Sequence, residues 1–165
     1  MLKYFMDIIL RDTSSTFRYR ARAIIESADK IAIMRVDDAG YYHLPGGHVS
    51  IGETSGQTLV REIREELDFD VEIDKLVCVG ERFYTKLAES IHELVFYYTV
   101  KFKSEVPLEN KVLIETEHGK SKKNELFWVT RAELANLDVR PKEIKDLIIN
   151  QGLDVFIHLA EHVDS

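Results

Sequence analysis

Three glutamates, Glu62, Glu65 and Glu66, have the chemistry and the spacing of ligands for a metal ion. In a helix of about 3.6 residues per turn they would lie on one face, where like charges repel each other. A hard divalent cation such as Mg²⁺ would neutralise them, because it binds one or two carboxylates and completes its shell with waters and phosphate oxygens. A solvated acidic face is the alternative, and the acids alone do not exclude it.

The neighbouring residues predict how the chain would position these acids. Thr54 and Gln57 have the spacing of a capping box, which predicts that a helix begins after Thr54. The helix face opposite the acids is apolar and suits burial; it carries Leu59, Val60, Ile63 and Leu67. Before the helix, Gly46 and Gly47 permit a tight turn and a close approach of the backbone to a ligand.

The order of residues in this segment resembles the signature box of the Nudix hydrolases, which cleave nucleoside diphosphates linked to another moiety. The matching positions are Gly47, Glu53, Arg61, Glu62, Ile63, Glu65, Glu66 and Phe69. One position differs, because Asp68 stands where the family has glycine. That glycine ends the helix in the left-handed conformation, which Asp also adopts, so we expect the fold to tolerate the change.

The resemblance implies roles for these positions. Glu62 and Glu66 are the first expected metal ligands and Glu65 the third, with the backbone carbonyl of Gly47 as a further ligand. The expected cation is Mg²⁺, with Mn²⁺ as the alternative. Glu53 and Arg61 are expected to form an ion pair that supports the loop against the helix. The expected catalytic residues are therefore Glu53, Arg61, Glu62, Glu65 and Glu66.

The resemblance does not identify the general base, because members of the family differ in which glutamate takes this role. Glu65 is one candidate. Acids outside the box are others, although each alone is more typical of a surface charge: Glu93, Glu115, Glu117 and Glu125.

The residues that bind the substrate are harder to predict from the sequence. Arg18, Arg20 and Arg22 alternate and would line one face of a strand, where they could bind phosphate or simply face solvent. His43 and His48 flank the Pro-Gly-Gly turn, although an incidental role in the loop is slightly favoured for each. The candidate substrate-binding residues are Arg20, Arg22, His43, Gly46, Gly47 and His48.

Aromatic residues could offer a platform for a nucleobase, but the core is the more typical place for them. Tyr84, Tyr97 and Tyr98 lie in strand-like segments, where tyrosines usually pack against neighbours. Trp128 lies in an apolar run and is also expected in the core.

The rest of the chain predicts strands interspersed with a few helices. The expected strands are Tyr4–Leu10, Phe17–Glu26, Lys30–Val36, Val71–Arg82, His92–Phe102 and Glu125–Val129. This pattern indicates a single domain, residues 1–165, of the α+β class: an α/β/α sandwich with a mixed β-sheet and flanking helices. The Nudix resemblance implies the same architecture.

Capping residues, proline and glycine predict where two further helices begin and end. Thr130 to Glu133 forms a second capping box, for a short helix to about Leu137. Pro141 begins a helix that should run to about Gln151, with Gly152 as its stop. The polar stretch Ser104–Asn124 is expected to be a loop with at most one short strand. The tail Asp154–His162 is ambiguous between strand and helix.

The composition and net charge of the chain limit the binding partners and the cellular compartment that we expect. The net charge of −7 argues against non-specific binding to nucleic acid or to anionic membranes. The single cysteine, Cys78, excludes an internal disulfide and is typical of a reducing cytoplasm. We find no pattern of a signal peptide and no apolar run of membrane-spanning length. We expect a cytoplasmic protein with a small-molecule nucleotide substrate, and a homodimer stays open.

The expected activity is metal-dependent hydrolysis of a diphosphate linkage in a nucleoside diphosphate derivative. The substrate classes left open are a nucleoside triphosphate, a nucleotide sugar or ADP-ribose, a dinucleoside polyphosphate and, least favoured, a capped RNA. One alternative is a Nudix fold that senses a nucleotide without cleaving it. Another is an isomerase of isopentenyl diphosphate, which would need a catalytic cysteine, but Cys78 lies in an apolar run.

Overall fold

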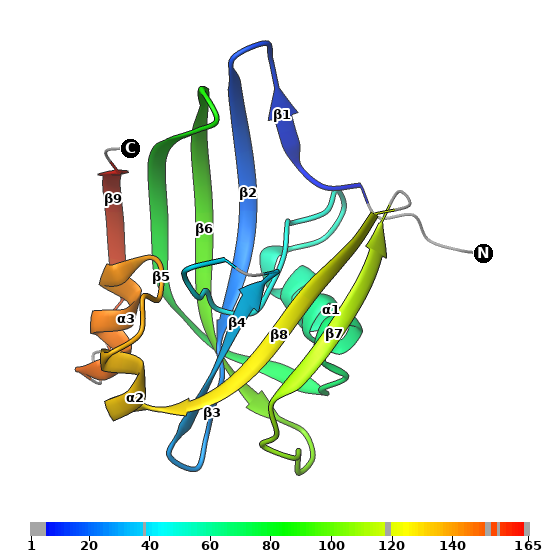
Figure 1. Cartoon of the computed structure of the whole chain (residues 1–165), viewed down its shortest axis with the longest axis vertical. Coiled ribbons are helices and arrows are strands. Elements are labelled where there is room, and N and C mark those ends of the chain that lie inside the picture. Colours follow the sequence, from blue (N-terminus) through cyan, green and yellow to red (C-terminus); the bar gives the residue numbers. More distant parts are fainter. Residues whose placement is uncertain (1–5, 38, 118–119, 151–152, 155, 164–165) are drawn as a thin grey trace.

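Two β-sheets form the framework of the molecule (Figure 1). The computed structural model describes residues 6–37, 39–117, 120–150, 153, 154 and 156–163. The first sheet has, in spatial order, β1 (Ile9–Arg11), β2 (Ser15–Ile24), β6 (Glu89–Phe102), β5 (Val71–Lys86) and β9 (Ile157–Val163). The second has β3 (Glu26–Ser27), β4 (Lys30–Val36), β8 (Lys120–Thr130) and β7 (Lys111–Glu117).

The two sheets differ in strand direction. In the first, β2 runs parallel to β6, and β5 runs parallel to β9, while the other pairs are antiparallel. The second sheet is antiparallel throughout its described strands. The prediction of an α+β fold with a mixed sheet and flanking helices is confirmed. The division of the strands into two sheets was not part of that prediction.

The helix that carries the acids is α1 (Ser55–Leu67), and its ends are those that the sequence predicts. The Thr54 hydroxyl accepts a hydrogen bond from the Gln57 amide, and the Gln57 side chain accepts one from the Thr54 amide, so the capping box is complete. At the other end Asp68 has φ 58°, and its N–H donates to the Arg64 carbonyl. Asp68 therefore takes the left-handed position at which the family has glycine.

Alternating side chains build two separate cores. Ala21 and Ala23 of β2 face α1, whereas Ile24 on the same strand joins the other core. In β4, Met34 lies in the first core and Ile33 in the second. Since successive side chains of a strand point to opposite faces, the two cores lie on opposite sides of the β-structure.

Helices cover both sides. Leu59, Ile63 and Leu67 of α1 are buried in the first core. The second core is closed by α2 (Arg131–Ala135) and α3 (Lys142–Ile149), through Leu134 and Ile144. This arrangement leaves the acidic face of α1 free to line a cleft. Gln151 and Gly152, predicted as the end of α3, lie outside the described residues.

The prediction of a loop with at most one short strand at Ser104–Asn124 is partly right, because residues 105–110 form a loop and one strand follows it, but the start of β8 at Lys120 was missed. From Lys111 the chain forms β7, which pairs with β8 over seven positions from Lys111 opposite Leu126 to Glu117 opposite Lys120. The side chains of Val112 and Ile114 are 60% and 64% exposed. A strand that buries few apolar side chains lacks the alternation of apolar and polar residues from which a strand is predicted.

The structure defines two further segments. A tight hairpin joins β5 to β6, in which only Leu87 and Ala88 separate the two strands. Both have positive φ, 51° and 66°, as a type I′ turn requires, although neither residue is typical of that turn. The ambiguous tail forms a strand, β9, because it pairs with the backbone of β5.

The cap of α1 yields a prediction about stability. Replacing Asp68 by glycine should raise the free energy of unfolding by up to about 1 kcal/mol, because glycine adopts positive φ without steric cost. Replacing Asp68 by valine should lower it by about 1–2 kcal/mol, because a β-branched residue fits this conformation poorly. Urea unfolding of the three proteins measures both changes. Equal stability of the valine variant and the parent would contradict this account of the cap.

Candidate active site

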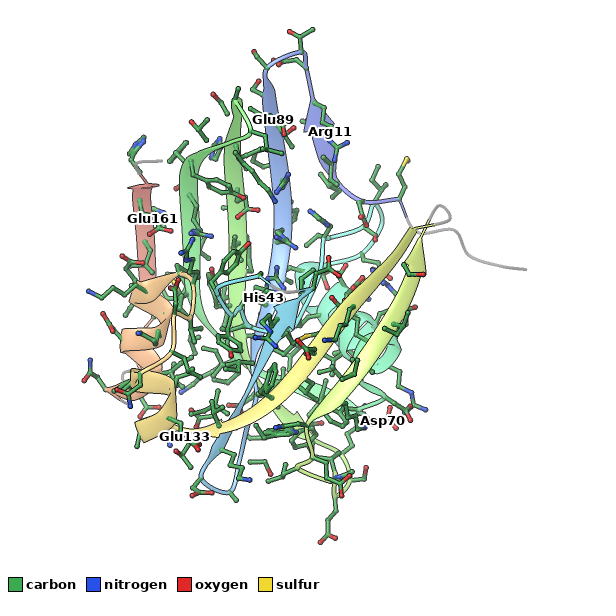
Figure 2. The ribbon with its side chains drawn as sticks, in the orientation of Figure 1. Arg11, His43, Asp70, Glu89, Glu133 and Glu161 are labelled. Atoms are coloured by element: carbon green, nitrogen blue, oxygen red, sulfur yellow. The ribbon has the colours of Figure 1, made fainter. Side chains whose placement is uncertain are left out.

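A cleft of about 550 Å³ lies over the acidic face of α1, between residues of the two sheets. All of the residues predicted to bind substrate or metal line it: Arg20, Arg22, His43, Gly46, Gly47, His48, Glu62, Glu65 and Glu66. Sequence reasoning missed four others, namely Asp7, Met34, Val36 and Asn124. Figure 2 shows His43 in the middle of the molecule. The fold therefore gathers the predicted residues at one place.

The loop 43–48 is fixed to both sheets. The backbone of His43 exchanges hydrogen bonds with Met34 of β4, at 2.7 and 2.9 Å. Farther along the loop, the carbonyl of Gly47 accepts from Ala21 of β2 at 3.0 Å. A loop held at both ends keeps its two glycines at a constant position against α1.

The guanidinium of Arg22 also holds this loop in place. It is buried, and its Nη1 donates to the carbonyls of Leu44 and Gly46, each at 2.8 Å. Burial, followed by repulsion from Arg20, lowers the pKa of Arg22 to about 10. Arg22 therefore holds the loop in place and also lines the cleft.

Arg61 connects the loop to the acids of α1. It donates to Glu53 Oε2 at 3.1 Å, to Glu62 Oε1 at 2.6 Å and to Glu65 Oε2 at 3.0 Å. Burial alone would lower the pKa of Arg61, but hydrogen bonds to Glu53 and Glu62 hold it above its usual value. The predicted ion pair between Glu53 and Arg61 is present, and Thr58 adds a bond to Glu53 at 2.8 Å.

The surroundings of Glu62 disfavour its ionised form. Burial raises its pKa, Arg61 opposes that rise, and the charges of Glu65 and Asp7 add to it. The carboxylate also lies against Gly47, where a side chain on that residue would overlap it. Negative charge is thus concentrated where Glu62 faces the loop.

Arg20 and His48 place polar atoms in the cleft that have no hydrogen-bond partner among the described residues. These atoms, Arg20 Nε and His48 Nε2, are both buried. Burial, followed by the positive charges of Arg20 and Arg22, lowers the pKa of His48 to about 3, so its ring is neutral near pH 7. A buried polar atom without a partner costs about 1–3 kcal/mol, which a ligand that bonds to it would recover.

Two of the other acids that could act as the base lie outside the cleft. Glu93 is buried on β6 beside Arg18, Arg20 and Arg82, at 3.4–3.6 Å. Glu125 lies on the face of β8 opposite to Leu126, where it pairs with Arg35 at 2.7 Å. The side chains of Glu115 and Glu117 lie outside the described residues. Among the described candidates for the base, only acids of α1 line the cleft.

Most of the aromatic residues expected in the core pack there, but Tyr84 is only partly buried and lines a different cavity. Tyr97 and Trp128 are buried, and the Tyr98 hydroxyl bonds to Ser55 at 2.6 Å. Cys78 is buried in the second core, and burial raises its pKa to about 11. A cysteine so placed does not line the cleft, which argues against the isomerase alternative.

Comparison with known proteins decides the family. The family model described as NUDIX domain matches residues 16–148. The chain belongs to the Nudix family. Membership makes it a Nudix-type pyrophosphohydrolase, and such enzymes generally use divalent metal cations. No helix in the part of the chain that the structure describes is long and apolar enough to cross a membrane.

Individual relatives resemble this Nudix chain over most of its length. A Mycobacterium tuberculosis protein named "Putative 8-oxo-dGTP diphosphatase 2" is 31% identical over 126 residues, which are 74% of this chain and 79% of the relative. The crystal structure of a MutT protein from Bacillus halodurans has TM-score 0.58 and 15% identity, covering 89% and 90% of the two chains. The Ap4A hydrolase of Caenorhabditis elegans has TM-score 0.52 and 16% identity, covering 82% and 96%. These structural likenesses concern the fold alone.

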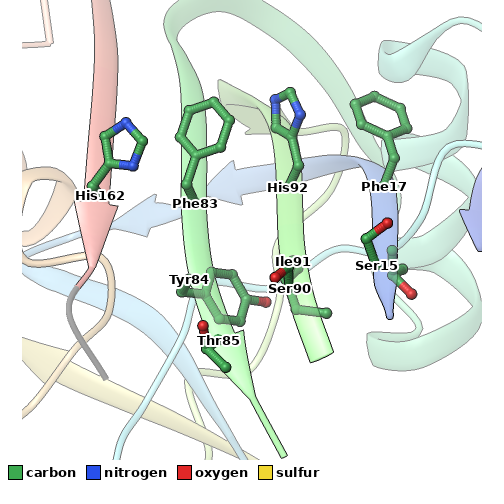
Figure 3. A pocket seen from close by; sticks show the side chains of 10 residues that line it. Ser15, Phe17, Phe83, Tyr84, Thr85, Ser90, Ile91, His92 and His162 are labelled. Carbon is green, nitrogen blue, oxygen red and sulfur yellow. The ribbon is translucent and has the colours of Figure 1, made fainter. Parts of the chain in front are cut away.

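A second cavity of about 440 Å³ lies elsewhere on the first sheet (Figure 3). Rings of Phe17, His92, Phe83 and His162 follow one another across four strands, with centroids 4.3–5.3 Å apart. No residue of the Nudix box lines it. Of these two cavities, the cleft over α1 is therefore the candidate active site of the Nudix enzyme.

The cleft fits a divalent cation in the chemistry of its donors. Glu62, Glu65 and Glu66 line it together and supply only oxygen atoms, which hard cations prefer. Among the described residues no three His, Cys, Asp or Glu side chains are grouped as metal ligands. Two of the acids face Arg61 instead.

The two glycines of the loop yield contrasting predictions. Gly46 has φ 127°, and a Cβ there would overlap the backbone carbonyl of Ala21, so Gly46→Ala should lower the free energy of unfolding by about 1–3 kcal/mol. The atoms nearest to a Cβ on Gly47 all belong to the Glu62 side chain. Gly47→Ala should therefore leave the unfolding free energy within about 1 kcal/mol and lower pyrophosphohydrolase turnover by about 10²-fold.

Urea unfolding and steady-state kinetics of both variants test this contrast. Gly52→Ala is the matched control for positive φ, because Gly52 has φ 84° but open space around it. Full activity of Gly47→Ala would show that the position of Glu62 against the loop is not required.

Proposed function

We propose that this Nudix enzyme hydrolyses a diphosphate linkage in a small nucleotide, with Mg²⁺ held by Glu62, Glu65 and Glu66 and by the carbonyl of Gly47. The observation that carries the proposal is the cleft itself, in which these carboxylates lie together with the guanidinium of Arg20. Carboxylates alone would repel a phosphate. Cationic and neutral donors beside them allow a charged diphosphate to bind.

The substrate class is a nucleoside triphosphate, a nucleotide sugar or ADP-ribose, or a dinucleoside polyphosphate. The name of the M. tuberculosis relative supports a nucleoside triphosphate among these. The net charge of −7 makes long RNA the least suitable substrate, because its binding relies on many phosphate contacts to a basic surface.

In this proposal, Arg20 binds a phosphate oxygen through its unpartnered Nε, and the neutral His48 donates or accepts one hydrogen bond through its buried Nε2. Arg22 holds the loop at Gly46, while the pair of Glu53 and Arg61 sets the position of Glu62. His43 lies beside these groups and lines the same cleft.

Hydrolysis adds the oxygen of a water to one phosphorus and breaks its bond to the bridging oxygen, which leaves on the other phosphate. A bound divalent cation neutralises phosphate oxygens and lowers the pKa of water. An acid of α1 takes the proton from the attacking water, and Glu65 is one candidate for this base. The hydrogen bonds from Arg61 orient the carboxylates of Glu62 and Glu65.

We further propose that residues 1–165 act as one Nudix domain in the cytoplasm. The buried thiol of Cys78 has no disulfide partner in the chain, as is typical of a reducing compartment.

Glu66→Gln tests the catalytic part of the proposal. With Mg²⁺ and a panel of nucleoside triphosphates, nucleotide sugars, ADP-ribose and dinucleoside polyphosphates, the parent should hydrolyse one class. The variant should lose on the order of 10²–10⁴-fold in kcat, because an amide neither holds a cation well nor accepts the proton. Chromatography of the products gives the rates and names the cleaved bond.

The matched control is Glu72→Gln, which changes an exposed acid on β5 in the same way. The control should hydrolyse at the parent rate. Unchanged turnover in Glu66→Gln would remove Glu66 from the mechanism. Tight nucleotide binding by the parent without turnover would instead favour the sensing module.

Removal of metal gives a separate prediction. Treatment with EDTA should abolish hydrolysis, and Mg²⁺ should restore it. Mg²⁺ alone should also raise Tm, because a ligand that binds only the folded state stabilises it. The rise in Tm should disappear in a protein that combines Glu62→Gln and Glu66→Gln. Turnover that persists in EDTA would contradict the metal dependence.

A further inference from the structure

We propose that Asn124 reads the nucleobase of the substrate. In this inference the side-chain amide forms two hydrogen bonds with a base edge that offers a donor beside an acceptor, while Met34 and Val36 pack against the ring. The inference rests on the proposed function, since it assigns the base to the same cleft. It concerns a residue outside the Nudix box.

The position of Asn124 is set by the second sheet. It lies opposite Val36 of β4 on one side and opposite Leu113 of β7 on the other. Two residues along β8, Leu126 faces the first core beside α1. Because side chains alternate along a strand, Asn124 faces the same side, where it reaches the cleft instead of the core.

The amide is buried but incompletely bonded. Asn124 is only 2% exposed, and its Oδ1 has no hydrogen-bond partner among the described residues. A buried amide in this state costs about 1–3 kcal/mol relative to a bonded one. Its neighbours along this face of β8, Leu126 and Trp128, are apolar and fill the core. An amide that interrupts this apolar face and lines a cleft is suited to bind a ligand.

The surroundings of Asn124 suit a base better than a phosphate. Met34 and Val36 of β4 are apolar and line the same cleft, and Met34 is 2% exposed. A flexible thioether adapts to a flat ring. The charged side chains of the cleft come instead from β2, from α1 and from Asp7 before β1. Two walls of different chemistry fit the two parts of a nucleotide.

The chemistry of the amide then determines what it can read. Asn carries one acceptor and two donors, so it can pair with an edge that presents a donor next to an acceptor. Asn pairs in this way with the amino group and ring nitrogen of adenine. A carboxylate at the same position could only accept, and would therefore favour bases with an amino group over those with an oxo group.

Binding of nucleoside monophosphates tests this inference apart from hydrolysis, because they contain no diphosphate linkage. Titration calorimetry with Mg²⁺ measures Kd for AMP, IMP, CMP, UMP and ribose 5-phosphate. The parent should bind at least one nucleotide about tenfold or more tightly than ribose 5-phosphate. Asn124→Leu should reduce that advantage to about threefold or less.

Asn124→Asp makes the test specific. It should shift the AMP to IMP and the CMP to UMP ratios of affinity by about tenfold toward the amino base. Asn136→Leu and Asn136→Asp are the matched controls, because Asn136 is exposed at the end of α2, where its side-chain amide donates to the carbonyl of Ala132. Both controls should keep the parent ratios. Thermal unfolding shows whether each variant is folded.

The outcomes separate this inference from the proposed function. Unchanged ratios in folded Asn124→Asp, or nucleotide binding by the parent no tighter than that of ribose 5-phosphate, would overturn the inference even if Glu66→Gln abolishes hydrolysis. The opposite outcome is also possible to observe: the parent binds nucleotides in a base-dependent way, Asn124→Leu removes this dependence, and the parent shows no turnover on the panel. That result would support the inference about Asn124 and contradict the proposed hydrolysis.

Discussion

The guanidinium of Arg61 makes the interaction on which the rest of the site depends. One cation bonds to Glu53 at the end of the loop and to Glu62 and Glu65 on the helix, and it also reaches the hydroxyl of Ser50. It therefore offsets the repulsion that the helix spacing imposes on the acids, and it ties loop and helix together. The planar fork of arginine allows these bonds at once, which a lysine could not reproduce.

Around this contact, the architecture supplies one chemical group from each element. The first sheet contributes Arg20, the second contributes Met34 and Asn124, and α1 contributes the acids. The loop between them is bonded to both sheets through His43 and Gly47. A shift of either sheet would therefore move the loop against the acids. The buried Arg22 adds to this coupling, because it holds two backbone carbonyls of the loop.

The largest error of sequence reasoning hid a residue of the cleft. The stretch Ser104–Asn124 is polar, and its strand β7 leaves Val112 and Ile114 exposed, so no apolar alternation marks it. Asn124 consequently stood at the end of an expected loop. A weaker signal was present, because Asn124 precedes Leu126 and Trp128 at a spacing of two, the period of one strand face. That period would have extended the strand to Asn124.

The sequence by itself determined α1, its capping box, the left-handed Asp68 and the acidic face, because each depends on residues within one or two helical turns. It also determined the family, since the box is contiguous. Tertiary structure alone decided that Arg22 serves the loop, that Glu93 and Glu125 lie outside the cleft, and that Asn124 lies within it. These facts depend on pairing between strands that are distant in the chain. Local spacing does not encode which distant strand faces a given side chain.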